Sequence, residues 1–393
     1  MSERFLSTTA AAARLGVARD TLYAYVSRGR LQAHRRTGHR GSWFDPVEID
    51  ALVRKARAPS ERQPDLRMRS AVTLIESGRY WYRGHDPGQL AATCRFESVA
   101  ELLWSGRDPH APATWGPDRD AAARARTAQD VLPRGTSPVD RLRVIVAVLG
   151  ASDSLRCDLR PEGAVSTARR LLATTALALP GRGKRTIADA IVGWLGRSRS
   201  AAIVDAVNAA LIVMADHELA ASTLAVRVAA SFKADPYAAV STGLGAVSGA
   251  WHGAASLGVE TMLGGVARGQ RAADVLGRAL ARDRHVPGFG QSLYPDGDPR
   301  MPVLGVIARR FGPTTAADAL LKVAADQGLP PANVDFGLAV LARALGLASG
   351  GGEALFVVGR LAGWLAHAIE EYADRSELRM RALYVGLRPP LKA

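Results

Sequence analysis

The sequence predicts an all-α protein preceded by a small, strongly basic domain. Apolar residues make up 48% of the 393 residues, which is enough for a large buried core. Beyond residue 66 they recur every three or four positions, as at Val99, Leu102 and Leu103. A doubly wound α/β sheet is disfavoured, because regular buried strands between the helices are missing. One short strand pair is expected between Thr73 and Tyr82.

Positive charge is concentrated in the first 57 residues. The chain carries 51 Lys+Arg against 37 Asp+Glu, a net charge of +14. Residues 1–57 hold eleven basic and five acidic residues, a net of +6, and the other 336 residues share +8. Five arginines with no acid between them fall within thirteen residues: Arg28, Arg30, Arg35, Arg36 and Arg40. Such a cluster is often only a solvated face, so its structural setting decides how it is interpreted.

The residues around this cluster predict two short helices and an extended pair. Residues 7–9 can cap a helix that runs through Leu15. After a tight turn, a second helix is expected over residues 18–28, ended by a glycine. An arginine-rich extended pair follows over residues 31–44, and residues 45–48 form a capping box that starts another helix.

The order helix, tight turn, helix and basic extended pair is that of a winged helix-turn-helix. Residues 5–57 resemble MerR-like regulators and excisionases, which implies a second helix in the major groove and arginines on phosphates. Leu22 and Val26 are expected to be buried. The residues expected to face duplex DNA are Arg19, Tyr25, Arg28, Arg35, Arg36 and Arg40. A helical module that contacts protein is the alternative.

The linker, the cysteine count and the lengths of the apolar runs limit which classes of protein are possible. Residues 58–66 are polar and contain proline, which predicts a linker between a domain at 1–57 and a helical domain at 67–393. Two cysteines exclude a disulfide framework, and without a His-Glu-x-x-His motif or paired cysteines no metal site is expected. No apolar run reaches the roughly 18–20 residues of a membrane span, and no signal peptide is recognisable. A cytoplasmic protein with no membrane partner is expected.

Six stretches of the helical part contain histidines, arginines or acids that could take part in chemistry. They are residues 215–223, 249–255, 288–300, 333–336, 359–367 and 379–384. In this order, and after Tyr82-Arg83-Gly84, they make residues 67–388 resemble the citrate synthase family. The resemblance implies a helical homodimer with a large and a small domain that close over the substrate. It also implies condensation of acetyl-CoA with oxaloacetate to citrate and CoA, without metal or cofactor.

The residue types in these stretches suit that chemistry. Forming the carbon–carbon bond requires removal of a methyl proton from the thioester, and the resemblance implies Asp335 as the base. It implies His252 as the hydrogen-bond donor to the enolate oxygen. The two carboxylates of oxaloacetate suit bidentate guanidinium groups. The residues that match the family's oxaloacetate-binding positions are His217, Arg300, Arg360 and Arg379, the last reaching in from the partner subunit.

One catalytic position departs from the family pattern. The family places a histidine after Gly-Phe-Gly, where it polarises and then protonates the ketone, and this chain has Gln291 there. A glutamine amide donates hydrogen bonds but delivers no proton at neutral pH. Losing a positioned general acid typically costs on the order of 10²–10⁴ in rate. His285 is a candidate for rescue, although it is more simply a helix-end residue. The expected enzyme is therefore slow or altered in its keto-acid preference.

Two further functions stay open at the level of sequence. One is a DNA-binding regulator that uses a degenerate citrate synthase domain as a metabolite sensor, favoured by the basic N-terminal segment and by Gln291. The other is a partner subunit that dimerises with an active homologue and lends it Arg379.

Duplex-DNA binding by the N-terminal domain is tested by its salt dependence. If arginines displace counterions from phosphates, affinity should fall roughly tenfold or more between low and physiological salt. Fluorescence anisotropy of labelled duplex DNA measures this for residues 1–57 and for the full chain. Absence of binding by both at low salt would contradict the prediction.

Overall fold

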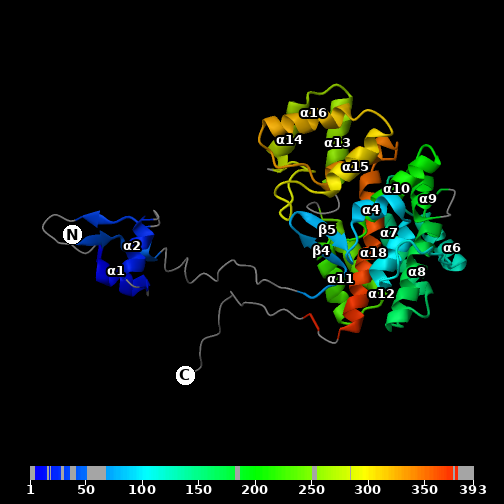
Figure 1. The fold of residues 1–393 in the computed structure, drawn as a ribbon, viewed down its shortest axis with the longest axis horizontal. Coiled ribbons are helices and arrows are strands. Elements are labelled where there is room, and N and C mark those ends of the chain that lie inside the picture. Colours follow the sequence, from blue (N-terminus) through cyan, green and yellow to red (C-terminus); the bar gives the residue numbers. More distant parts are fainter. Residues whose placement is uncertain are drawn as a thin grey trace. The chain divides into compact units, whose positions relative to one another are not determined.

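The structure is a computed structural model. It describes residues 5–15, 17, 19–27, 31–35, 41–50, 68–181, 186–249, 255–283, 285–374 and 377–378. The chain divides into two compact units, residues 1–69 and residues 70–393, which are drawn in Figure 1. The predicted linker at 58–66 lies outside the described residues.

The described residues of the first unit form short helices and a three-stranded antiparallel sheet. Its elements are β1 (Leu6–Ser7), α1 (Thr8–Leu15), α2 (Arg19–Ser27), β2 (His34–Arg35) and β3 (Ser42–Phe44), and β3 is the central strand. The predicted cap of the first helix is confirmed, because Ser7 Oγ accepts a hydrogen bond from the Ala10 amide at 3.3 Å. The extended pair is present as β2 and β3. Strand β1 was not predicted, since two residues carry no recognisable periodicity.

The capping box at residues 45–48 forms only in part. Asp45 Oδ1 accepts from the Val47 amide at 2.8 Å, and residues 46–50 are helical as predicted. In a complete capping box the carboxylate of Glu48 would accept from the Asp45 amide. Here its Oε2 accepts from the Gln32 amide at 3.2 Å instead. Its carboxylate therefore ties this helix to the segment before β2.

The small core of this unit corrects one expectation. Leu22 is fully buried, as predicted, together with Phe44 and Ile49. Tyr25 was expected to face outward, and that is wrong: it is half-buried and packs against this core. Residues three apart on a helix share a face, so Tyr25 follows Leu22 inward. Arg19 is exposed and donates from Nη2 to Thr9 Oγ1 at 2.7 Å.

The remaining residues predicted to contact DNA are not placed. Arg28, Arg36, Arg40 and the side chain of Arg35 lie outside the described residues. The winged helix-turn-helix and its contacts with DNA therefore stay predictions.

The second unit is helical apart from one hairpin, so the all-α prediction is confirmed for this part of the chain. The expected strand pair is β4 (Thr73–Glu76) and β5 (Arg79–Tyr82), paired antiparallel. The helices are α4 (Pro87–Thr93), α5 (Phe96–Ser105), α6 (Arg119–Gln129), α7 (Pro138–Ser152), α8 (Pro161–Ala178), α9 (Ile187–Leu195), α10 (Ala201–Met214), α11 (Ala221–Ser231), α12 (Pro236–Val247), α13 (Ala255–Ala267), α14 (Ala272–Asp283), α15 (Arg300–Arg309), α16 (Thr315–Asp326), α17 (Val334–Ala344) and α18 (Gly351–Ala373). No helix among the described residues is both long and apolar enough to cross a membrane.

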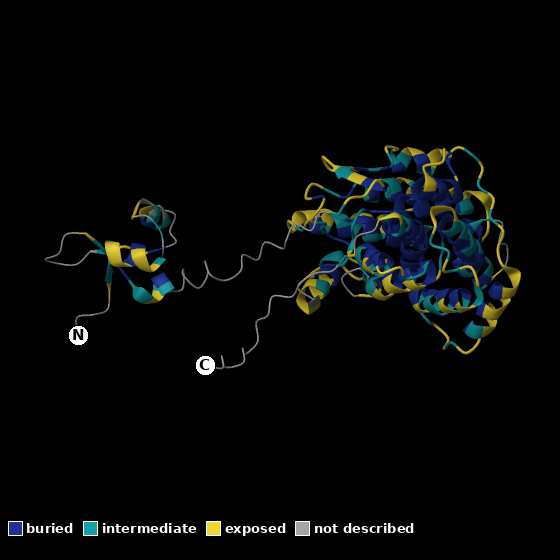
Figure 2. Cartoon of the chain, turned by 90° about the horizontal axis from the view of Figure 1, so that it is seen from below, coloured by how far each residue is buried: buried dark blue, intermediate teal, exposed yellow. Residues whose placement is uncertain are grey.

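These helices form a larger and a smaller group (Figure 1). Helices α13 to α17 pack on one another. In the larger group α5 and α7 to α12 contact α18, while α4 packs on α10 and α6 packs on α7 and α8. Helix α18 is buried on all sides from Gly351 to Ala368, so most of its residues are apolar whichever way they point. Figure 2 shows that buried residues fill the interior of this unit while exposed ones mark its periphery.

The loop after α10 packs closely against the middle of α18. The Gly363 amide donates to Ala215 O at 2.8 Å. A Cβ atom added at Gly363 would collide with that carbonyl and with Asp216 Oδ1. Glycine is therefore required here because the two backbones approach so closely.

We expect Gly363→Ala to destabilise the protein by about 1–3 kcal/mol, because the added methyl overpacks a buried contact. Gly245 in α12 is a matched control, since it is exposed and an added Cβ meets nothing within 4 Å. Gly245→Ala should be neutral or stabilising by up to about 1 kcal/mol. Urea unfolding followed by circular dichroism measures both, and equal effects would contradict the packing argument.

Candidate active site

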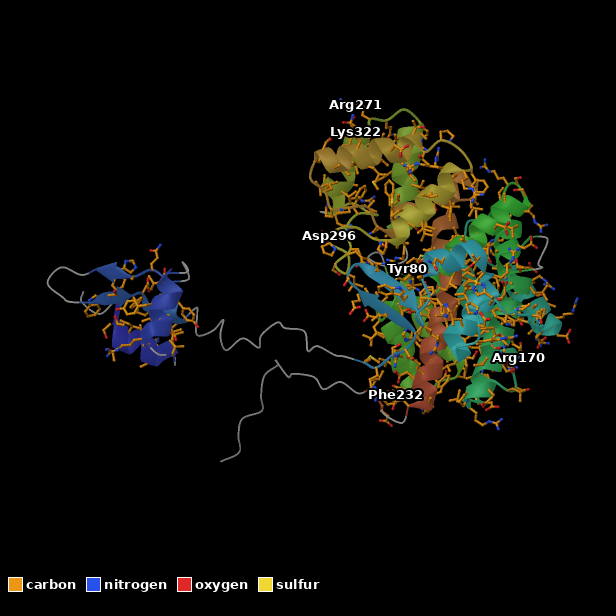
Figure 3. All side chains as sticks on the ribbon, viewed as in Figure 1. Tyr80, Arg170, Phe232, Arg271, Asp296 and Lys322 are labelled. Carbon is orange, nitrogen blue, oxygen red and sulfur yellow. The ribbon has the colours of Figure 1, made fainter. Side chains whose placement is uncertain are left out.

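Four residues singled out in the sequence meet where the two groups of helices join. His217 lies in the loop after α10, Arg300 begins α15, Asp335 lies in the first turn of α17, and Arg360 lies within α18. The charges of Arg300 and Arg360 act on both His217 and Asp335. Tyr80 of β5 joins them with its ring centroid 6.0 Å from that of His217, and Figure 3 shows it near this junction.

Arg300 is a buried guanidinium that is already held by a carboxylate. Asp298 accepts from its Nε at 2.9 Å and from its Nη2 at 2.7 Å. Asp298 also accepts from the Val334 amide at 3.1 Å, which joins the arginine to the start of α17. Burial opposes the charged form, but Asp298 outweighs it and keeps the pKa of Arg300 above its ordinary value. Of the five N–H donors, Asp298 occupies two, so the Nη1 side is the part that can bind an anion.

Arg360 is also buried, but its direct contacts stabilise its charge less than Asp298 stabilises that of Arg300. Its Nε donates to Met214 O at 3.1 Å, and its guanidinium lies 5.1 Å from the centroid of the Phe356 ring. Burial lowers the pKa of Arg360, while the charge of Asp216 raises it. An arginine stays protonated under these conditions. A buried cation whose direct contacts here are a carbonyl and an aromatic ring favours an anionic ligand.

His217 is the neutral member of the group. It is buried, and its Nε2 lies 2.8 Å from the hydroxyl of Tyr294. Burial, followed by the charges of Arg300 and Arg360, lowers the pKa of His217 well below its ordinary value. It is therefore an uncharged hydrogen-bonding group at neutral pH, and it adds no third positive charge to the site.

The loop before α15 is tied to the start of α17. The Asn333 amide donates to Gly288 O and its Nδ2 donates to Gly290 O, both at 2.9 Å. Gly288 has φ +82°, and a Cβ there would collide with Val259. Asn333 also caps α17 by accepting from the Asp335 amide at 3.0 Å. These bonds set the position of Asp335 relative to the Gly-Phe-Gly segment.

Asp335 is the unusual titrating group of the site. Its Oδ1 is shielded from solvent and has no hydrogen-bond partner within the described part of the chain. Burial raises the pKa of Asp335 to about 7, and the charge of Arg300 only partly opposes this. A carboxylate with an unoccupied oxygen and a pKa near neutrality suits the role of a general base.

Gln291 lies in the same loop and is half-buried. Its backbone oxygen accepts from the Tyr294 amide at 3.0 Å, and its Oε1 is 3.4 Å from Ser292 Oγ. His285 is exposed beyond the end of α14. His252 and Arg379 lie outside the described residues, so their roles stay predictions.

A buried ionic network beside the site was not predicted from the sequence. Asp216 Oδ2 lies 3.3 Å from His367 Nε2, and His367 Nδ1 lies 2.9 Å from Arg227 Nη1. Arg227 pairs with Glu370 at 2.9 Å and with Glu371 at 2.5 Å. Arginine only donates, so His367 Nδ1 is the acceptor and Nε2–H donates to Asp216. The sequence feature that could have indicated it is the run of ionisable residues at the end of an apolar helix, because such residues must be paired when they are buried.

The comparisons with known proteins cover most of the second unit. The family model "Citrate synthase, C-terminal domain" matches residues 66–381. "Citrate synthase 2" of Bacillus subtilis is 30% identical over 350 residues, which cover 81% of this chain and 93% of that protein. The chain belongs to the citrate synthase family. The family match begins at residue 66, so it does not bear on the N-terminal unit.

Further relatives and structures agree with this membership. "2-methylcitrate synthase" of Mycobacterium tuberculosis is 27% identical over 373 residues, covering 86% of this chain and 95% of that protein. The citrate synthase structure from Thermotoga maritima has a TM-score of 0.65 at 25% identity, covering 82% of this chain and 94% of that one. The Thermoplasma acidophilum citrate synthase, in complex with carboxymethyl coenzyme A and oxaloacetate, has a TM-score of 0.67 at 22% identity and supports the fold alone, covering 84% and 96%.

The pKa of Asp335 predicts a pH-dependent stability. The carboxyl titrates at about 7 in the folded protein and near 3.8 in the unfolded chain. Between these values only the unfolded state is ionised, so the contribution of Asp335 to stability is complete below the lower pKa and is lost as the pH rises toward 7. Asp335→Asn should therefore gain stability relative to wild type, by a few kcal/mol at most, between about pH 4 and pH 7. Urea unfolding across this range measures the difference, and a pH-independent difference would contradict the raised pKa.

Proposed function

We propose that this chain condenses a short acyl-CoA with oxaloacetate and releases CoA. Acetyl-CoA gives citrate, and propionyl-CoA, which carries one more carbon, gives 2-methylcitrate. The observation that carries the proposal is Asp335, a shielded carboxyl with an unpartnered oxygen and a pKa near 7, set beside two buried arginines. Membership of the citrate synthase family supports this class of reaction.

The arginines suit the keto-dicarboxylate. Arg300 offers the side of its guanidinium that Asp298 leaves unoccupied, and Arg360 offers a buried charge in weak contact with neutral groups. Each can bind one carboxylate through charge-assisted hydrogen bonds. The charges of both arginines act on His217, which stays neutral and therefore adds no positive charge that would repel the guanidinium groups.

Asp335 suits the proton removal that starts the reaction. A carboxylate with a pKa near 7 is a stronger base than an ordinary aspartate and is still about half ionised at neutral pH. Removing a methyl proton makes the enolate, whose carbon attacks the ketone. Water then cleaves the thioester of the resulting acyl-CoA. In this proposal His252 donates to the enolate oxygen, and Arg379 reaches the site from the partner subunit of a homodimer. No metal or cofactor takes part.

Asp335→Asn tests the base. We expect its CoA release from acetyl-CoA and oxaloacetate to fall on the order of 10²–10⁴. In the wild type, kcat/KM should rise with pH through about 7 as Asp335 ionises. A thiol-reactive dye measures CoA release, and propionyl-CoA in the same assay ranks the acyl substrates. A pH profile with no rise near 7 would contradict the role of Asp335.

The Gln291→His variant distinguishes the proposed enzyme from a ligand sensor. A histidine at this position can deliver a proton, so we expect the variant to release CoA faster than the wild type, by up to about 10²–10⁴. An inactive wild type with an active variant would argue against a natural synthase. If neither turns over and oxaloacetate still raises the melting temperature, a ligand sensor is favoured. The comparisons give no support to a DNA-binding regulator, which rests on the basic N-terminal segment and on Gln291.

A further inference from the structure

The proposed condensation leaves one proton to be delivered. When the enolate carbon bonds to the ketone carbon, the carbonyl electron pair moves to the ketone oxygen and makes an alkoxide. The side chain of Gln291 is a carboxamide, which donates hydrogen bonds but does not give up a proton near neutral pH. Another group of the site must therefore protonate that oxygen.

Tyr294 places a hydroxyl in this part of the site. It follows Gln291 by one turn of chain and is buried, with 2% of its surface exposed. Its hydroxyl lies 2.8 Å from His217 Nε2, and the two ring centroids are 5.4 Å apart. The charge of Arg300 acts on both side chains. The hydroxyl is thus located at the cationic end of the site, where the keto-dicarboxylate is proposed to bind.

The tautomer of His217 determines what this hydrogen bond can do, because either of its two atoms can be the donor. A neutral imidazole carries one N–H, and in the tautomer with Nε2 protonated it donates to the oxygen of Tyr294. In that tautomer, which the proposal below requires, the phenolic proton is not used by the imidazole and can pass to another acceptor. When the proton leaves, the same N–H and the charge of Arg300 stabilise the phenolate oxygen.

We propose that Tyr294 is the general acid of the condensation and that His217 orients it; this rests on the proposed function. Asp335 takes the methyl proton, and the enolate carbon forms the carbon–carbon bond with the ketone. The O–H bond of Tyr294 breaks as its proton passes to the alkoxide, which becomes a tertiary alcohol. The phenolate and the protonated Asp335 then exchange one proton through water, which restores both groups.

The neighbouring tyrosine is less suited to this role. Tyr80 also lies beside His217, but its hydroxyl is directed to Val213 O at 3.4 Å. Burial raises the pKa of Tyr80 well above its ordinary value. Burial raises the pKa of Tyr294 only to about 12, with Arg300 opposing, which stays below that of an aliphatic alcohol. Proton transfer from Tyr294 to the alkoxide is therefore downhill.

Tyr294→Phe tests the proposal when enolisation and condensation are measured separately. Exchange of the acetyl-CoA methyl protons with D₂O, with malate in place of oxaloacetate, reports enolisation by Asp335 alone. We expect exchange within about threefold of the wild type, while CoA release with oxaloacetate falls on the order of 10²–10⁴. Tyr372→Phe is the control, because it removes the hydroxyl of a half-buried tyrosine that is bonded to Ala234 O at 2.7 Å, away from these residues.

A second variant guards against a folding defect. Replacing Tyr294 by 3-fluorotyrosine keeps the hydroxyl and lowers its pKa, so condensation should persist with its alkaline limb moved to lower pH. An unmoved limb, or wild-type condensation by Tyr294→Phe, would overturn the role of Tyr294. So would equal losses of exchange and condensation in Tyr294→Phe. A wild type with neither exchange nor CoA release would overturn the proposed function itself, and the inference with it.

Discussion

The buried carboxylate of Asp216 is the contact on which the site depends. It accepts from Thr73 Oγ1 of the hairpin at 2.5 Å and from the Glu218 amide at 3.1 Å, and it meets His367 of α18. Burial disfavours its charged form, but His367 and the other donors outweigh that and keep the pKa of Asp216 below its ordinary value. One ionised group thus joins the hairpin, the loop that carries His217 and the helix that carries Arg360. A buried charge is costly when its partners are removed, so loss of these contacts would disfavour this arrangement of the three segments.

Burial and the charges of the two arginines oppose each other at Asp335 but act together at His217. The arginines stabilise an ionised Asp335, yet burial dominates and the pKa rises to about 7. For His217 the two act in the same direction, since burial and both arginines disfavour a protonated ring. The site therefore holds a carboxyl that is readily protonated and an imidazole that is not. This combination keeps positive charge on Arg300 and Arg360 without adding a third charge at His217, which suits the proposed binding of a dicarboxylate.

Much of the fold could be predicted because helical periodicity and turn residues report local burial. The hairpin was predictable from its turn, and the order of the motifs predicted that His217, Arg300, Asp335 and Arg360 come together. Tyr25 was placed on the wrong face although its spacing from Leu22 contained the answer. Other features need tertiary structure: the pairing of Arg300 with Asp298 depends on how the chain turns before α15. The pKa of Asp335 depends on burial, which no local pattern of residues contains.

The effect of having Gln291 in place of a histidine depends on the other side chains of the same loop. A histidine there would titrate near neutrality, whereas a tyrosine keeps its proton until a strongly basic oxygen forms beside it. The hydroxyl of Tyr294 already contacts His217, so the proposed mechanism needs no further element to place a proton donor near the ketone. A weaker acid delivers its proton later, after the carbon–carbon bond has begun to form. Condensation would then depend more on the charge of Arg300, which stabilises both the alkoxide and the phenolate that replaces it.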